Sequence, residues 1–577
     1  MHRGIARLLF VPVLLMACFV VFVLGCNRSS STPTPTLPTT ATEAFPAWFT
    51  DVTRKVGMDF IHDAGPTGSY FYPQIMGSGA ALFDFDNDGR LDLLLLQGAG
   101  PNTKAKNRLY HQEADGHFKD VSAGSGLDFC GYCMGVAIGD VNNDGWPDVL
   151  VTEYRGARLF LNNGDGTFRD VTKEAGINNP LWGASAAFFD YDRDGWLDLV
   201  IVNYLDYDPS VTCSNAAGRR DFCHPSTFKG TVTKLFHNRG PAGDAKSPLV
   251  RFEDVTIKSG LGALPGPGLG VVCADFDGDG WPDIFVANDS HANYLWINRH
   301  DGTFKEEAVG RGVAVNRMSK AEANMGVAYG DVDGDGLMDV FVTHLTDETN
   351  TLWRQGPRGF YRDQTIAMGL TSGSWRGTGF GAILADFDLD GALDLAIANG
   401  RVSQPQGSPK ADFWSNYAER NQLFGNRGNG IFRDLSLHNP AFCGTPEVSR
   451  ALACGDLNND GAIDLVVTTI AGPAHILYNA APKNGHWLLV RAFDPQLHRD
   501  AYGAEITVRA LDRHWVRLAH PAQSYLSSND PRAHFGLGPH SRIDAIEVLW
   551  PDGSKEVFPG QPADQIVTVR KGEGKPR

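Results

Sequence analysis

The chain has 577 residues, among them 66 glycines and 32 prolines, a content that suits an all-β protein with many turns. Asp and Glu outnumber Lys and Arg by 67 to 51, which gives a net charge of −16. Such an acidic chain is a poor candidate for a nucleic-acid-binding protein.

The first 25 residues are predicted to be a bacterial lipoprotein signal peptide. Two arginines precede an apolar run from Leu8 to Leu24, and Gly25 and Cys26 follow it. The ending Val-Leu-Gly-Cys resembles a lipobox, in which the cysteine is lipidated and becomes the mature N-terminus. An uncleaved membrane anchor is the alternative, because the apolar run is almost long enough to cross a bilayer. We expect an exported bacterial lipoprotein of the cell envelope or surface, attached to the membrane through a lipid on Cys26.

Residues 26–48 are rich in Ser, Thr and Pro. A segment of this composition cannot bury an apolar core. We therefore expect a disordered tether between the lipid anchor and the first folded domain.

One nine-residue pattern recurs seven times in the next part of the chain. Positions 1, 5, 6 and 9 are Asp, Asp, Gly and Asp in every copy, and position 3 is Asp in five copies and Asn in two. Calcium takes six to eight hard oxygen ligands, which the side chains at positions 1, 3, 5 and 9 and the carbonyl at position 7 can supply. Glycine at position 6 permits the sharp turn that such a loop needs. The sequence predicts about seven calcium ions.

The predicted calcium ligands are Asp84, Asp86, Asp88 and Asp92; Asp140, Asn142, Asp144 and Asp148; Asp190, Asp192, Asp194 and Asp198; Asp275, Asp277, Asp279 and Asp283; Asp331, Asp333, Asp335 and Asp339; Asp386, Asp388, Asp390 and Asp394; and Asp456, Asn458, Asp460 and Asp464.

An EF-hand is the obvious competitor for these loops, and it fails at position 12. An EF-hand needs a bidentate Glu there, whereas all seven copies have an aliphatic residue. Apolar and largely β-branched runs follow each loop, which is typical of strands and not of an exiting helix. Each loop is therefore predicted to lie in a β-hairpin.

Two further strand patterns accompany each loop, one resembling Phe-x-Asp-Val before it and one resembling Leu-aromatic-x-Asn after it. Four strands per unit in seven units predict a seven-bladed β-propeller over residues 49–480. A β-solenoid is the alternative, but its repeats are much shorter. Seven copies of each element are obtained only if counting starts at Phe49. We therefore expect residues 49–53 to complete the last blade, beside the unit of residues 456–478.

The seven units, with their flanking strands, resemble FG-GAP/VCBS repeats, which build the propellers of integrin α-chains. The tail from Asn484 resembles the ASPIC/UnbV domain of the cartilage acidic protein family and its bacterial relatives. The matching stretches of the tail are Ala501–Ala504, Ser524–Pro531, His534–Gly538 and Val548–Gly553. The two resemblances cover about residues 49–571 and imply the fold, calcium and a location outside the cytoplasm, but no particular activity.

Residues 481–577 are predicted to form this second domain, a small β-sandwich or barrel, because apolar residues alternate along them and a Pro-Asp-Gly turn interrupts them. The domain is expected either to cap the last blade or to bind a ligand.

Six cysteines form locally spaced pairs, which are disulfide candidates in an exported protein. These pairs are Cys130 with Cys133, Cys213 with Cys223, and Cys443 with Cys454. The first pair precedes Met134, where haem attachment would need His. Cys273 lies in an apolar run and is predicted to be a buried thiol.

The sequence contains none of the common hydrolase, metalloprotease or phosphate-binding motifs. We expect a monomeric module that binds an extracellular protein or glycan ligand. A calcium-dependent polysaccharide lyase and a structural protein of a surface layer are the alternatives, so catalysis stays open.

The ligand is expected on the face opposite the calcium loops. Insertions of about residues 203–232 and 399–420 follow second strands and should rise from that face. A polar residue ends the second strand of every unit: Gln97, Glu153, Asn203, Asn288, His344, Asn399 and Thr469. These residues either form a ring around the channel mouth or are simply polar strand ends. Aromatic anchors on the insertions, together with His344, are the ligand-face candidates: Tyr204, Tyr207, Trp414 and Tyr417.

Overall fold

A computed structural model describes residues 45–242, 249–405, 410 and 412–577. The predicted signal peptide, Cys26 and the tether up to Ala44 lie outside these residues. Residues 45–577 form one compact unit. Within the described ranges, no helix has the length and the apolar character needed to cross a membrane.

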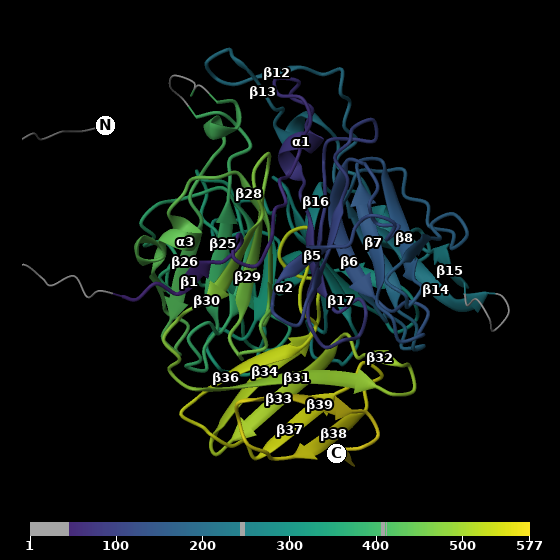
Figure 1. Ribbon diagram of the computed structural model, residues 1–577, viewed down its shortest axis with the longest axis vertical. Coiled ribbons are helices and arrows are strands. Elements are labelled where there is room, and N and C mark those ends of the chain that lie inside the picture. Colours follow the sequence, from purple (N-terminus) through teal and green to yellow (C-terminus); the bar gives the residue numbers. More distant parts are fainter. Residues whose placement is uncertain (1–44, 243–248, 406–409, 411) are drawn as a thin grey trace, which may run out of the picture. The chain divides into compact units, whose positions relative to one another are not determined.

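Strands make up most of the regular structure, which confirms the prediction of an all-β protein (Figure 1). The α-helices of the described chain are single turns: α1 (Pro73–Met76), α2 (Ala308–Arg311) and α3 (Pro440–Cys443). Four 3-10 turns lie at Pro225–Thr227, Leu261–Ala263, Trp414–Asn416 and Ser436–His438.

Seven antiparallel sheets in the described chain share one plan, in which an aspartate-rich loop joins the first strand to the second. The first three sheets are β2 (Ala80–Phe83), β3 (Asp92–Leu95), β4 (Arg108–Gln112) and β5 (Phe118–Asp120); β6 (Cys133–Gly139), β7 (Asp148–Glu153), β8 (Gly156–Asn162) and β9 (Phe168–Asp170); and β10 (Gly183–Phe189), β11 (Asp198–Asn203), β14 (Lys234–Ala242) and β15 (Leu249–Asp254). A ribbon of β12 (Cys213–Ser214) and β13 (Arg220–Asp221) lies between β11 and β14 in the chain.

The remaining four sheets follow the same order. They are β16 (Gly268–Ala274), β17 (Asp283–Asn288), β18 (Tyr294–Asn298) and β19 (Phe304–Glu306); β20 (Val327–Gly330), β21 (Asp339–Val342), β22 (Thr351–Gln355) and β23 (Tyr361–Asp363); β24 (Gly379–Ala385), β25 (Asp394–Asn399), β26 (Gln422–Asn426) and β27 (Phe432–Asp434); and β28 (Ser449–Gly455), β29 (Asp464–Thr469), β30 (His475–Asn479) and β1 (Phe49–Asp51).

The seventh sheet takes its fourth strand from the start of the described chain. Strand β1 pairs antiparallel with β30, with Phe49 opposite Asn479 and Asp51 opposite Leu477. The prediction that residues near Phe49 complete the last unit is confirmed.

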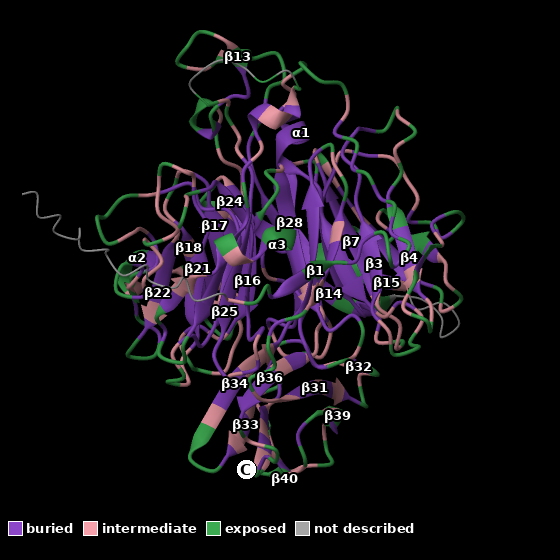
Figure 2. Ribbon diagram, turned by 60° about the vertical axis from the view of Figure 1, so that its left-hand side comes forward, coloured by how far each residue is buried: buried purple, intermediate pink, exposed green. Residues whose placement is uncertain are grey.

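Apolar cores lie between neighbouring sheets. The first strands contact one another in chain order from β2 to β28, and β28 contacts β2. The core between the seventh and first sheets includes Leu82, Leu93, Val466 and Ile476. Because each sheet has a neighbour on both faces, strands such as β7 and β17 are buried along their whole length (Figure 2). Burial on both faces explains the continuous apolar runs of these strands.

Amide side chains at the ends of the third strands tie each sheet to the one before it. In the second sheet, Asn162 Nδ2 donates a hydrogen bond of 2.8 Å to the carbonyl of Phe85, at position 2 of the preceding loop. The same bond recurs in every sheet, from Asn238, Asn298, Gln355, Asn426 and Asn479 and, in the first sheet, Gln112. Gln112 donates to Leu457 of the seventh sheet at 2.8 Å. The Asn of the Leu-aromatic-x-Asn pattern therefore holds the loops in register.

The C-terminal domain consists of two packed sheets. One contains β31 (His486–Asp494), β32 (Arg499–Asp500), β36 (Ala533–Gly538) and β39 (Gln565–Arg570), and the other contains β33 (Ala504–Ala510), β34 (Arg513–Ala519), β37 (Ala545–Leu549), β38 (Lys555–Pro559) and β40 (Lys575–Pro576). Apolar side chains from both sheets, such as Leu488, Phe535, Ile506 and Trp550, share one core. This arrangement is a β-sandwich.

Residues 521–530, here called the central segment, leave this domain and lie among the first strands of the seven sheets (yellow in Figure 1). Within the central segment, β35 (Ser527–Ser528) pairs in parallel with β2. Ser524 forms a bridge with Val327 of β20, and Leu526 N donates to Ser185 Oγ of β10. The central segment thus joins the C-terminal domain to several sheets at once.

Candidate metal centres and the opposite face

The seven aspartate-rich loops have one hydrogen-bonding pattern. Position 1 accepts the N–H of the position-6 glycine in every loop, at 2.8–3.0 Å; in the first loop the two residues are Asp84 and Gly89. Position 9 accepts the N–H of position 2, at 2.9–3.1 Å. Gly89 has a φ of +88°, a conformation that costs glycine little and other residues more. The backbone therefore fixes the carboxylates before any ligand enters.

The position-9 side chains lie at the centre of each cluster and are fully or almost fully buried. Burial, reinforced by repulsion from the other loop carboxylates, raises the pKa of Asp92 to about 8. The same causes raise the pKa values of Asp198 and Asp339 to about 8. Such groups keep their charge at neutral pH only with a cation nearby.

A buried oxygen without a partner marks four of the loops. The Oδ1 atoms of Asp86, Asp192, Asp333 and Asp388, all at position 3, are buried and have no hydrogen-bond partner among the described residues. In the loops of Asp84, Asp190 and Asp275, the carboxylates of positions 1, 3 and 5 lie within 4.8 Å of one another. A carboxylate cluster with an unsatisfied buried oxygen fits a divalent cation such as calcium.

The loops differ in the residue that the third strand places beside them, which is the x of the Leu-aromatic-x-Asn pattern. In sheet order these residues are His111, Leu161, His237, Ile297, Arg354, Gly425 and Tyr478. Arg354 forms ion pairs with Asp333 and, at 2.9 Å, with Asp335. Arg311 of α2 similarly contacts Asp277 at 2.9 Å. Arg90 likewise pairs with Asp88 of the first loop, and Lys483 lies 3.7 Å from Asp460 of the seventh. Four loops thus have a built-in cation on predicted calcium ligands, and sequence reasoning missed all four.

Arginines of the C-terminal domain reach the same loops. Arg499 Nε donates to Asn143 Oδ1 at 2.8 Å, and its Nη2 donates to the carbonyl of Gly195 at 3.1 Å. Arg532 Nη1 donates to Asn459 Oδ1 at 3.0 Å. The domain therefore contacts the loops of several sheets and does not merely cap the last one.

The aromatic ligand-face candidates are gathered together, but they are buried. Tyr204, Tyr207, Trp414 and Tyr417 belong to one core with Tyr72 and Tyr525, and none is more than 9 % exposed. Tyr207 OH accepts the N–H of Tyr72 at 3.2 Å. The prediction that these aromatic side chains are exposed and can bind a ligand is therefore wrong. Their rings pack against one another and against Tyr72, Ile75 and Met76 in and beside α1.

His344 and the other strand-end polar residues are buried as well. His344 Nε2 lies 3.0 Å from Thr351 Oγ1, and burial lowers its pKa to about 4. Asn203 and Asn399 donate to the backbone carbonyls of Val232 and Arg420 at 2.9 and 2.8 Å. These two residues satisfy backbone groups at strand ends, whereas Glu153 pairs with Arg158. All seven are buried and form no exposed ring, which favours the simpler of the two interpretations.

One of the three predicted cysteine pairs is bonded, Cys213 with Cys223. The other two predictions are wrong, since Cys130, Cys133, Cys443 and Cys454 are free. Cys130 donates to the carbonyl of Thr103, whereas Cys133 accepts from Asn107.

Cys443 and Cys454, the last predicted pair, lie at opposite edges of the seventh sheet. Cys443 lies in α3, beside the outer strand β1, and Cys454 lies on the first strand β28. Cys273 is a buried free thiol, as predicted.

Comparison with known proteins supports the assignment of the repeats and of the C-terminal domain. The model of the family described as FG-GAP-like repeat matches residues 84–151, 140–201, 275–342 and 331–397, and that described as ASPIC and UnbV matches residues 494–576. Human cartilage acidic protein 1 is 25% identical over 97% of this chain and 78% of its own length, and the Mus musculus protein is 25% identical over 88% and 74%.

Solved structures give weaker matches. A lectin of Agrocybe aegerita, in a structure of the recognition of non-reducing terminal N-acetylglucosamine, has a TM-score of 0.40 at 15% identity and covers 70% of this chain and 92% of its own. A structure of BBS1N in complex with ARL6DN has a TM-score of 0.36 at 11% identity and covers 70% and 92%. By its sequence, the chain carries FG-GAP-like repeats and a C-terminal ASPIC and UnbV domain, and it is homologous to cartilage acidic protein 1.

Proposed function

We propose that this chain is an exported calcium-binding module that captures an extracellular protein or glycan, built on a closed seven-bladed β-propeller. Closure is supported by the contact of β28 with β2, by the pairing of β1 with β30 and by the hydrogen bond from Gln112 to Leu457. A closed ring leaves no apolar sheet face exposed between the first and last sheets.

Calcium binding is carried by one observation, the unpartnered buried oxygen at position 3 of four loops with otherwise ordered carboxylates. Calcium binds the folded loops and scarcely the unfolded chain, so it should raise stability. At a hundredfold excess over its dissociation constant, each site contributes about 2.7 kcal/mol. We expect the loops with Asp at position 3 to bind more tightly than those with Asn142 or Asn458, because they offer one more charge.

Thermal unfolding with calcium and after chelation tests this part of the proposal. We expect a lower Tm after chelation, and an unchanged Tm would overturn calcium binding. Asp148→Asn should reduce the rise in Tm that calcium causes, because it removes the negative charge of a buried ligand. Asp115→Asn is the matched control, since that side chain is 71% exposed and lies outside the loops.

Export and anchoring are supported by the lipobox-like sequence at Cys26 and by the disulfide between Cys213 and Cys223, which needs an oxidising compartment. Labelling with radioactive palmitate should mark the wild-type protein and not Cys26→Ser, and the variant should leave the membrane fraction. A variant that stays in the membrane fraction would show that the apolar run itself is the anchor.

The ligand is sought with glycan and extracellular-matrix protein arrays, with and without calcium. We expect the protein to bind its ligand on the array only in the presence of calcium, because the calcium-bound loops order the protein surface around them. The absence of capture under both conditions would overturn the binding function.

A further inference from the structure

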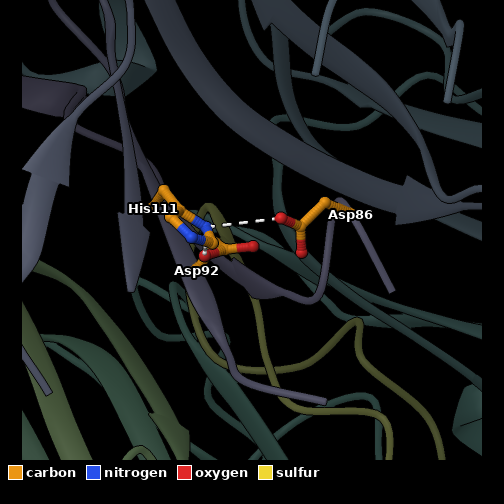
Figure 3. Close-up of side chains that lie close together, drawn as sticks. All are labelled: Asp86, Asp92 and His111. Carbon is orange, nitrogen blue, oxygen red and sulfur yellow. Dashed lines mark hydrogen bonds and ion pairs between the residues drawn. The ribbon is translucent and has the colours of Figure 1, made fainter. Parts of the chain in front are cut away.

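Two of the seven loops face an imidazole as well as carboxylates. In the first sheet, His111 of β4 points into the loop that follows β2 (Figure 3). Its Nδ1 lies 3.1 Å from Asp92 Oδ1 and 3.6 Å from Asp86 Oδ2. Two carboxylates from one strand and its loop and a nitrogen from the next strand therefore converge on one point.

The third sheet builds the same site again. His237 Nδ1 of β14 lies 3.0 Å from Asp198 Oδ1 and 3.4 Å from Asp192 Oδ2. The side chain of Asp198 is 0% exposed, and that of His237 is 9% exposed. The same arrangement of one histidine and two aspartates thus occurs in two sheets whose surrounding sequences differ, so it is a feature of the fold and not of one loop.

Hydrogen bonding alone does not account for this convergence. Each histidine Nδ1 forms a hydrogen bond with the position-9 carboxylate, at 3.1 Å to Asp92 and 3.0 Å to Asp198. The position-3 oxygens lie farther from the same nitrogens, at 3.6 and 3.4 Å, so these hydrogen bonds do not explain why they are there. A cation at the centre would contact all three atoms. In both loops, the second oxygen of the position-3 carboxylate, Asp86 Oδ1 or Asp192 Oδ1, is buried and has no partner in the described chain. Each site thus has a donor left unused by the protein itself.

The spacing of the donor atoms suits a small divalent metal ion. Zinc binds nitrogen and oxygen at about 2.0–2.2 Å, so two ligand atoms in a tetrahedral site lie about 3.3 Å apart. The four distances from the histidine nitrogens to the carboxylate oxygens run from 3.0 to 3.6 Å. All three donor atoms of each site lie within 4.8 Å of one another, so rotation of the carboxylate side chains can bring them onto one ion.

The donor chemistry then selects the metal. Calcium takes oxygen ligands, whereas imidazole is a preferred ligand of zinc and other late transition metals. We propose that the loops of Asp84–Asp92 and Asp190–Asp198 bind a zinc-type transition metal through the position-3 and position-9 carboxylates and His111 or His237. This assignment rests on the metal-binding function proposed above. It removes the loops of Asp86 and Asp192, two of the four with an unpartnered position-3 oxygen, from the calcium set and leaves five other loops.

The chain supplies its own controls. The loop of Asp140 has Leu161 in the place of the histidine, so His111→Leu and His237→Leu copy a side chain that the fold already accepts there. His300 touches one loop carboxylate, Asp279, at 2.7 Å and is 43% exposed, so it lacks the second carboxylate and the burial.

The test measures zinc retained by the full chain after dialysis against micromolar zinc in millimolar calcium. We expect two zinc ions per wild-type chain, one in either single variant, none in the double variant and two in His300→Leu. Substitution with Co²⁺ should give visible absorption that the double variant loses. The Gln variants at both histidines provide the same readout if a Leu variant does not fold.

Two outcomes would overturn the assignment: no zinc retained in calcium, or zinc retention that does not depend on either histidine. The effect of calcium on the Tm distinguishes failure of the transition-metal assignment from failure of the proposed calcium binding. If zinc is not retained but chelation still lowers the Tm, only the transition-metal assignment falls. If calcium and chelator both leave the Tm unchanged, the proposed calcium function falls with it.

Discussion

His475 of β30 joins the two ends of the repeat region by contacting Asp51 of β1. His475 Nδ1 lies 3.1 Å from Asp51 Oδ2, and its Nε2 lies 3.0 Å from Glu447 Oε2. Burial by itself lowers the pKa of His475, but the hydrogen bonds to both carboxylates and their charges outweigh it and raise the pKa to about 9. The imidazolium therefore holds the N-terminal strand in the seventh sheet at neutral pH.

The first prediction is a loss of stability in mild alkali. Between about pH 6.5 and pH 9 the folded state binds more protons than the unfolded state, so the free energy of unfolding falls as pH rises. The contribution is fully present below the pKa of unfolded histidine and is lost as pH rises through about 9. It amounts to at most about 3 kcal/mol, and to less here because the side chain is 22% exposed.

Denaturant unfolding over this pH range, at constant calcium, measures the effect. His475→Gln should flatten the pH dependence. His117→Gln is the control, because His117 pairs with exposed Asp115 and is itself 58% exposed. Equal slopes in wild type and His475→Gln would show that this histidine does not control closure.

The second prediction concerns the strand that His475 holds. A chain that starts after Thr53 lacks β1, so β30 loses its outer neighbour and exposes a free edge. We expect aggregation of this chain, whereas a chain that starts at Phe45 should remain monomeric. Size-exclusion chromatography with light scattering checks both, and a soluble, monomeric chain without β1 would contradict the ring closure.

The sequence predicted the repeats and the strand that completes the seventh sheet because both predictions use short local patterns. Aspartate, glycine and aspartate at fixed positions define each loop, and the apolar runs beside them define strands. Counting the Phe-x-Asp-Val pattern was enough to assign Phe49 to the sheet of Asn479. The Asn of the Leu-aromatic-x-Asn pattern was visible too, but its bond to the preceding loop became apparent only in three dimensions.

The burial of the aromatic residues on the face opposite the aspartate-rich loops could not be predicted. In the sequence, an aromatic residue on an insertion looks the same whether its side chain is exposed or buried. Tyr207 is covered by Tyr72, more than 100 residues earlier in the chain, and the core beneath it includes Tyr525 of the central segment. Nothing in the local sequence of either insertion encodes these contacts. Two of the three cysteine pairs failed for a similar reason, since spacing does not show which way a thiol points.

The third prediction follows from that burial. Tyr207→Ala and Trp414→Ala should each lower the free energy of unfolding by about 3–5 kcal/mol, the usual cost of removing a buried aromatic side chain. Tyr207→Phe should cost only about 1 kcal/mol, because it keeps the ring and loses the hydrogen bond from Tyr72. Denaturant unfolding in calcium tests this, and Ala variants as stable as wild type would mean that the rings are exposed.

The last prediction concerns the central segment, which makes the C-terminal domain part of the repeat structure. Tyr525 is 1% exposed, its OH donates to the carbonyl of Met76 at 2.9 Å, and its ring lies 4.9 Å from that of Phe380. Because it packs simultaneously against α1 and β24, the domain and the sheets should unfold in one transition. Tyr525→Phe should cost about 1–3 kcal/mol for the lost buried bond, and Tyr525→Ala about 3–5 kcal/mol.

Both variants should shift the single transition, followed by tryptophan fluorescence and by far-ultraviolet circular dichroism, to lower denaturant concentration without splitting it. Leu511→Ala, in the same domain but 81% exposed, is the matched control and should leave the midpoint unchanged. If Tyr525→Ala instead produced a separate early transition while the sheets unfolded at the wild-type midpoint, the domain would be an independent attachment. A single shifted transition is expected because β35 and β2 share a sheet, so neither part can lose its structure without removing hydrogen bonds from the other.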